Sequence, residues 1–105
     1  MVDKLVKDGM VAVLYSPGYG AGWYTWAGEK GEEMLFDPVL AQAILNGKSK
    51  SEIEELAESR YPDEYCGGAE DLQVAWLPEG TLFRIDEYDG NESVSLADHQ
   101  QWIKA

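Results

Sequence analysis

The chain has 105 residues, of which 45% are hydrophobic, and it carries 20 acidic against eight basic residues. This length and composition predict one domain over residues 1–105 with a packed interior, and they exclude a disordered chain. The formal net charge of −12 excludes non-specific binding to nucleic acid or to an anionic membrane, because both need clustered Lys and Arg. With one cysteine and no long apolar run, we expect a cytoplasmic protein without a disulfide or a membrane span.

The N-terminal segment predicts two paired strands. Residues 10–15, MVAVLY, are rich in β-branched and aromatic residues and follow Asp8-Gly9, which is a turn sequence. A first strand around residues 2–6 is expected to pair with this run.

A glycine-rich segment follows the strand. Pro17 ends the strand, because proline donates no hydrogen bond to a ladder. Residues 18–22 are then expected to be irregular or bulged, since glycine is typical of positive φ. Residues 23–26, WYTW, favour a resumed strand, and residues 27–33 favour a charged loop.

The first of two predicted helices begins at Asp37-Pro38, where an N-cap acceptor precedes a proline at the first helical position. Its apolar positions recur at helical spacing. Asn46-Gly47 is a C-terminal stop signal, because glycine readily adopts the left-handed conformation there.

The second helix is predicted to begin at Ser51, with Glu54 three residues later completing a capping box. Ile53 and Leu56 lie on its apolar face. Pro62 ends it.

The C-terminal third predicts a meander of three strands over residues 71–77, 81–88 and 92–96. The turns are Pro-Glu-Gly at 78–80 and Asp-Gly-Asn at 89–91, the latter being the strongest hairpin signal in the chain.

Together these elements predict an α+β domain in β-α-α-β-β-β order, with a mainly antiparallel sheet and two helices packed on one face. In the strand at 81–88, Phe83 and Ile85 share one face and Arg84 lies on the other. Residues 97–105 are expected to form a last strand or a docking tail.

The glycine-rich segment is the main candidate site. GYGAG at residues 18–22 lacks the spacing of a dinucleotide fingerprint and the Lys-Ser/Thr of a P-loop. Backbone N–H groups around glycines can nevertheless form an anion-binding nest, and neighbouring aromatic rings can stack on a planar ligand. The alternative is a bulge that turns the chain and packs the tryptophans on the helices. The ligand hypothesis assigns Ser16, Gly18, Tyr19, Gly20, Gly22, Trp23, Trp26 and Arg84 to the site.

Arg84 is a candidate because it lies mid-strand in a chain with few cations. It can form a cross-strand ion pair, or it can clamp an anionic ligand through two hydrogen bonds. Arg60, at the end of the second helix, has the same two interpretations, and its place near a helix C-terminus favours the structural one.

No catalytic or metal site is predicted. Cys66 and His99 form the one possible nucleophile pair, and nothing in the sequence brings them together, so a buried, inert cysteine is expected. One histidine and one cysteine exclude a structural zinc site, and residues 86–92 do not match a calcium loop. We therefore expect neither a metal nor another cofactor, and no enzymatic activity.

Four segments resemble a group of small proteins encoded in bacteriophage genomes and prophages. The similar strings are VAVLYSPGYGAGWYTW, LFDP, YCGGAEDL and WLPEGTLFRIDEYDGNESV, and they span most of the chain. The resemblance assigns no residue of this chain to a functional site. It implies an accessory protein that counters a host defence, either by sequestering a nucleotide signal or by masking a host protein.

Two functions from different classes follow. In the first, the protein is a non-catalytic receptor, expected to be a homo-oligomer, whose glycine segment and aromatic rings hold a small nucleotide-like ligand. Such a ligand must approach a chain of charge −12, so Arg84, Arg60 or a lysine would have to line the site. In the second, the acidic surface mimics nucleic acid and masks a basic site on a host defence protein.

Overall fold

The computed structural model describes residues 3–18, 20 and 22–96. Residues 97–105, where a last strand or tail was expected, lie outside this range, as does Tyr19. The described part contains β1 (Val6–Lys7), β2 (Met10–Tyr15), α1 (Gly31–Phe36), α2 (Pro38–Leu45), α3 (Lys50–Arg60), a 3₁₀ turn η1 (Ala69–Asp71), β3 (Gln73–Pro78), β4 (Phe83–Tyr88) and β5 (Asn91–Leu96).

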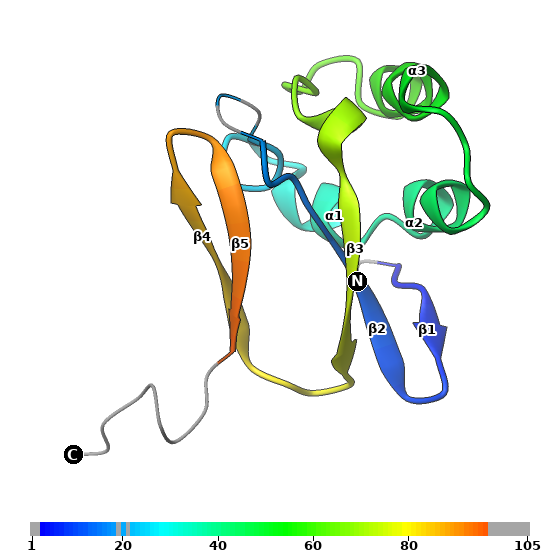
Figure 1. Ribbon diagram of the computed structural model, residues 1–105, viewed down its shortest axis with the longest axis vertical. Coiled ribbons are helices and arrows are strands. Elements are labelled where there is room, and N and C mark those ends of the chain that lie inside the picture. The colour runs from blue at the N-terminus through cyan, green and yellow to red at the C-terminus, as the bar shows by residue number, and fades with distance from the viewer. Residues whose placement is uncertain (1–2, 19, 21, 97–105) are drawn as a thin grey trace.

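The predicted α+β architecture is confirmed, and its strands divide into two antiparallel sheets. One sheet has the order β1-β2-β3, and the other is the β4–β5 hairpin. Figure 1 shows the hairpin on the left of the three-stranded sheet, with α2 and α3 on the right. The predicted meander is therefore interrupted after β3, where the chain leaves one sheet to form the other.

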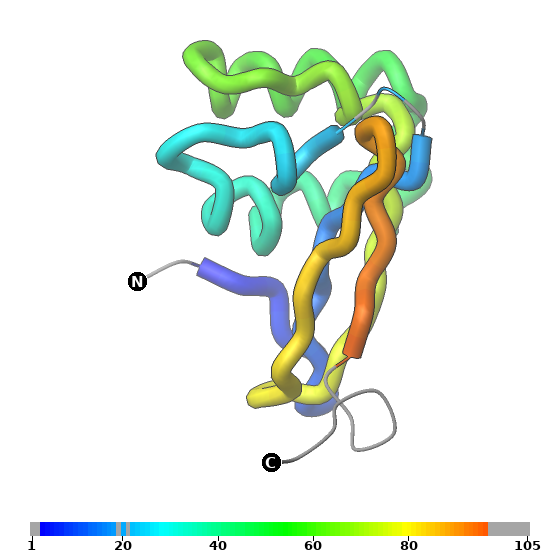
Figure 2. Tube along the Cα trace, turned by 90° about the vertical axis from the view of Figure 1, so that its left-hand side faces the viewer, coloured from blue at the N-terminus to red at the C-terminus, as the bar shows by residue number. Residues whose placement is uncertain are grey.

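Strand β2 lies in the middle of the molecule and is buried on both faces. Ala12 and Leu14 belong to the core beneath the helices, whereas Val11 and Val13 belong to a second core beneath the hairpin. A strand covered on both sides has no polar face, so its sequence is a continuous apolar run. Figure 2, turned by 90°, shows the helices and the hairpin around this sheet.

The larger core lies between the three-stranded sheet and the helices. Met34 from α1, Leu40 from α2 and Ile53 from α3 meet Leu14 there, and each is at most 4% exposed. Burying side chains of this size contributes about 1.5–3 kcal/mol each. The helices therefore cover one face of the sheet, as predicted.

The second core attaches the β4–β5 hairpin to β2 and α1. Phe83, Ile85 and Val94 pack against a buried cluster that includes Val13 and Phe36. The face predicted for Phe83 and Ile85 is thus the inward face. A two-stranded hairpin is marginally stable by itself, so this packing is what holds it in place.

Two-residue turns close both hairpins. Asp8-Gly9 and Asp89-Gly90 adopt positive φ at each position, from 51° to 85°. This is the mirror-image turn that matches the twist of paired strands, and Asp-Gly is a preferred sequence for it. The Asp-Gly-Asn hairpin signal is therefore confirmed.

Helix boundaries differ from the sequence prediction at α3. The capping box uses Ser49 and Glu52, whereas Ser51 and Glu54 were predicted. The two pairs have the same spacing, and the earlier one gives the helix an additional half turn. The later pair lies inside the helix.

The segment between β2 and α2 also differs from the prediction. Residues 23–26 form turns, and no strand resumes there. Part of the predicted loop is α1, which places Met34 and Leu35 in the two cores. Residues 23–26 have a high β propensity, but they do not form a strand here. The backbone N–H groups of Trp23 and Thr25 bond to a side chain from β5 and are therefore not available for pairing in a sheet.

Candidate functional site

The glycine-rich segment lies against the turn of the β4–β5 hairpin. The N–H groups of Gly20 and Gly22 donate to the carbonyls of Asp89 and Gly90. Both glycines have positive φ, 74° and 66°, as the sequence indicated. The segment therefore joins the two sheets at one end of the molecule.

Glu92 of β5 holds the residues on either side of this segment. Its side chain is 1% exposed. Oε1 accepts a hydrogen bond of 3.0 Å from the backbone N–H of Ser16, and Oε2 accepts bonds of 2.9 and 2.8 Å from those of Trp23 and Thr25. The Thr25 hydroxyl also donates to Oε2 at 2.7 Å. These backbone donors bind an anion, as a nest does, and the anion is the chain's own carboxylate.

Trp23 is a core residue. Its side chain is 0% exposed, and its ring N–H donates to the carbonyl of Met34 at 2.9 Å. The ring meets that of Tyr61 edge to face, with centroids 6.5 Å apart. The Trp23 ring therefore packs in the core, as in the alternative interpretation of the glycine-rich segment, and does not line an open site.

Trp26, which follows the segment, reaches the surface. It is 40% exposed, and its ring centroid lies 5.5 Å from that of Tyr65, which is 43% exposed. The indole ring lies directly on the backbone of Gly22, where an added Cβ would be 2.4 Å from a ring carbon. The Tyr65 hydroxyl donates to the carbonyl of Gly20 at 3.3 Å. Gly22 thus allows the Trp26 ring to rest on the main chain, whereas Tyr65 meets Gly20 through the carbonyl of that residue.

These two rings line a cleft of about 560 Å³, which we call the aromatic cleft. This volume is within the range of small-molecule sites. Ten residues line it: Trp26, Gly28, Glu29, Lys30, Arg60, Tyr61, Pro62, Asp63, Glu64 and Tyr65.

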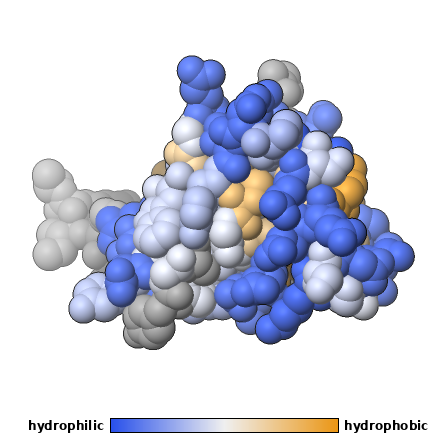
Figure 3. All heavy atoms as spheres, turned by 90° about the horizontal axis from the view of Figure 1, so that it is seen from above, coloured by the Kyte–Doolittle hydropathy of each residue, from blue (hydrophilic) through white to orange (hydrophobic). Residues whose placement is uncertain are grey.

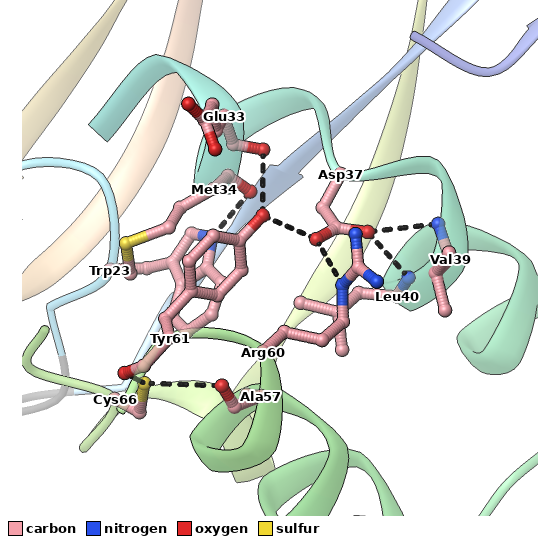
Figure 4. A network of polar contacts seen from close by, with 10 residues as sticks. All are labelled: Trp23, Glu33, Met34, Asp37, Val39, Leu40, Ala57, Arg60, Tyr61 and Cys66. Atoms are coloured by element: carbon pink, nitrogen blue, oxygen red, sulfur yellow. Dashed lines mark hydrogen bonds and ion pairs between the residues drawn. The ribbon is translucent and has the colours of Figure 1, made fainter. Parts of the chain in front are cut away.

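Arg60 is held in the aromatic cleft by a buried carboxylate. Its Nε donates at 2.7 Å to Oδ2 of Asp37, which is 1% exposed, while the Arg60 side chain remains 37% exposed. The other oxygen of Asp37 caps α2 by accepting from the N–H groups of Val39 and Leu40. Figure 4 shows this network, in which one carboxylate both caps α2 and orients the last residue of α3.

Tyr61 completes the network. Its hydroxyl donates to Oδ2 of Asp37 and lies 3.3 Å from the carbonyl of Glu33. Burial and then the bond to Asp37 raise the pKa of the Tyr61 phenol well above its usual value. The Asp37 bond is likewise the main reason that the pKa of Arg60 is raised, so its guanidinium stays charged.

Acidic side chains share the aromatic cleft with Arg60 and Lys30. Glu64 accepts from the backbone N–H groups of Gly28 at 2.8 Å and Lys30 at 3.4 Å. Glu29 and Asp63 are exposed at its rim. The aromatic cleft therefore combines two aromatic rings, tilted by 53° to each other, with charges of both signs.

The remaining predicted residues lie elsewhere. Arg84 lies on the outward face of β4, 3.0 Å from a carboxylate oxygen of Asp86. Four residues separate it from Asp89 in the turn, a path of about 16 Å along the strand. The buried Ser16 hydroxyl donates to the carbonyl of Gly68. Gly18 lines a different hollow of about 250 Å³.

The sequence analysis named Trp26 as a candidate site residue, and Trp26 lines the aromatic cleft, whereas Tyr65, Lys30 and Asp37 were not named as site residues. The sequence indicated Asp37 as an N-cap residue. This role accounts for the hydrogen bonds of Oδ1 but not for those that Oδ2 accepts from Arg60 and Tyr61. Nothing in the sequence brought Tyr65 to Trp26, because their meeting depends on how the segment after α3 folds back.

Cys66 is buried, as predicted. Burial raises the pKa of its thiol, and the nearby carboxylates of Glu58 and Glu64 raise it further. A thiol in this environment is a poor nucleophile. His99 lies outside the described residues.

Family models, curated proteins and solved structures were compared with this chain, and none of them matches it. Within the described residues, no group of three or more His, Cys, Asp or Glu side chains could hold a metal ion. In the same part of the chain, no helix is long and apolar enough to cross a bilayer.

Proposed function

We propose that the protein is a non-catalytic binding protein that holds a small nucleotide-like ligand in the aromatic cleft, at the edge of the glycine-rich segment. The supporting observation is that Trp26 and Tyr65 are both partly exposed, lie with their ring centroids 5.5 Å apart, and line a cleft with Arg60 and Lys30. Base stacking on such rings contributes about 1–3 kcal/mol per base. The two cations meet the requirement that a ligand with phosphate needs positive charge nearby.

The proposed setting is that of the phage proteins that the sequence resembles. In that setting the protein acts in the cytoplasm of the host cell as a homo-oligomer and withdraws a nucleotide signal from a defence system. Stoichiometric binding without turnover is sufficient for this role.

The test is calorimetric titration with nucleosides and nucleotides of adenine and guanine. We expect binding to weaken at least about fivefold in Trp26→Ala and in Tyr65→Ala, because each removes one stacking surface. Tyr88→Ala is the matched control, because Tyr88 is exposed outside the aromatic cleft. Equal affinities in the control and in both cleft variants, or no binding at millimolar concentrations, would reject the proposal.

A second proposed function rests on the outer side of α3. Glu52, Glu55 and Glu58 recur every three residues there and are exposed. Figure 3 shows a largely hydrophilic surface at this end of the molecule. An acidic inhibitor that masks a basic site of a host protein would bind more weakly as salt is added, and a salt-independent complex would exclude this alternative.

A further inference from the structure

The charges around the aromatic cleft carry an inference about the class of ligand. We infer that the aromatic cleft selects nucleotides with one phosphate group over those with two or three. This inference rests on the proposed function and makes it more specific, because it assigns Arg60 to one phosphate and the surrounding carboxylates to the rejection of further ones.

Arg60 is suited to hold a single anionic group. Its Nε is committed to Asp37 at 2.7 Å, so the guanidinium is fixed where it lines the aromatic cleft. A fixed guanidinium loses little entropy when it binds a phosphate, and its planar shape permits two parallel hydrogen bonds. Lys30 lines the same cleft and adds one mobile positive charge.

The positive charge available to a ligand is nevertheless small. Asp37 already balances Arg60, which leaves Lys30 against the three carboxylates of Glu29, Asp63 and Glu64. The whole chain, these residues included, carries a formal charge of −12. A first phosphate gains the contact with Arg60, whereas each further phosphate finds no second fixed cation among the described lining residues and is repelled by the acidic rim.

The experiment compares adenosine, AMP, ADP and ATP, with guanosine and its phosphates in parallel, at low ionic strength without divalent metal. We expect AMP to bind about tenfold more tightly than adenosine, and each added phosphate to weaken binding about threefold to tenfold. Added salt should narrow the differences between AMP, ADP and ATP, because the repulsion is screened.

Variants at the rim identify the cause. The double variant Glu29→Gln with Asp63→Asn removes two exposed carboxylates and leaves Glu64 on its backbone donors, so we expect ATP to bind severalfold more tightly and adenosine to bind as before. Glu79→Gln, an exposed acid outside the aromatic cleft, is the matched control. Lys30→Gln should reduce the ratio of the affinity for AMP to that for adenosine. Lys30 is chosen in place of Arg60 because a change at Arg60 would leave the buried carboxylate of Asp37 without its ion pair.

The outcomes separate the two proposals. Affinity that rises from AMP to ATP, or adenosine that binds as tightly as AMP, overturns the selection for one phosphate and leaves ring binding intact. If neither the adenine nor the guanine compounds bind, both proposals are overturned. An ATP affinity unchanged in the double variant also overturns the role of the acidic rim.

Discussion

At the scale of single residues, Glu92 is a buried carboxylate whose two oxygens bond, among the described residues, to three backbone N–H groups and one hydroxyl. It comes from β5 and bonds to Ser16, Trp23 and Thr25, so it fixes the direction in which the chain leaves β2. Burial of a charge is tolerated when its lone pairs are filled in this way. A change at this residue therefore reaches Trp26 and the aromatic cleft.

We expect Glu92→Gln to lower the free energy of unfolding by about 2 kcal/mol, because its NH₂ group would face a backbone donor. Glu92→Ala leaves all the donors unbonded and should cost more, about 4 kcal/mol. Urea denaturation measures both values. The control is Glu70→Gln at an exposed site, and a cost of under about 0.5 kcal/mol for either Glu92 variant would contradict this role.

Tyr61 gives a prediction about alkaline pH. Its folded pKa is raised by burial and by Asp37, whereas the unfolded phenol ionises near pH 10. Above that pH the unfolded state loses the proton first and binds fewer protons than the native state, so stability falls as pH rises. Below pH 10 this contribution is fully present.

The measurement is the free energy of unfolding of the protein and of Tyr61→Phe between pH 8 and about pH 11. Tyr61→Phe should be less stable at pH 8, because it loses the bond to Asp37, and its stability should fall less steeply above pH 10. Parallel curves for the two proteins would contradict the assignment.

At the scale of elements, the glycine-rich segment is shaped by contact as well as by backbone conformation. Gly20 and Gly22 both have positive φ, but a Cβ at Gly20 would meet nothing within 4 Å, whereas one at Gly22 would overlap the Trp26 ring. The two positions form a matched pair, because substitution by alanine imposes backbone strain at each and a steric clash at only one.

Gly20→Ala should therefore cost about 1 kcal/mol of stability, and Gly22→Ala about 1–3 kcal/mol more. Gly22→Ala should also displace Trp26 and weaken ligand binding, which Gly20→Ala should leave unchanged. Thermal unfolding and the titration described above measure these effects. Equal losses at the two glycines would show that contact with Trp26 is unimportant.

The elements that the sequence predicted are those with local signals. β2 follows from its apolar run, the β4–β5 turn from Asp89-Gly90, and the start of α2 from Asp37-Pro38. α1 was missed because two glycines and four charged residues hide its short apolar stretch in residues 27–36. Propensity alone does not indicate a six-residue helix that depends on tertiary packing.

The candidate site was predicted only in part, because its geometry depends on contacts between distant residues. One signal for Glu92 was present: the Asp-Gly turn pairs it with Glu87, and two acids directly opposite each other are unfavourable unless one is held elsewhere. The carboxylate of Glu92 is held by the residues that flank the glycine-rich segment. No comparable local signal joins Trp26 to Tyr65 or Asp37 to Arg60.

At the scale of the whole molecule, the cores on the two faces of β2 must stabilise a chain whose surface charges repel one another. The described ion pairs are few, and Lys48–Glu52 and Lys50–Asp71 are long and exposed. Exposed pairs of this kind contribute little. Self-repulsion at a formal charge of −12 should therefore lower the stability measurably at low salt.

We expect sodium chloride between about 10 and 200 mM to raise the stability by about 1 kcal/mol, or roughly 4–8 °C in Tm, because the Debye length falls below the spacing of exposed charges. The triple variant of Glu55, Glu70 and Glu79 to glutamine removes three exposed acids, so its Tm should be higher at low salt and depend less on salt. Potassium chloride should give the same curve, since screening depends on ionic strength and not on the cation. A Tm that does not change with salt would mean that the acidic surface costs the fold nothing.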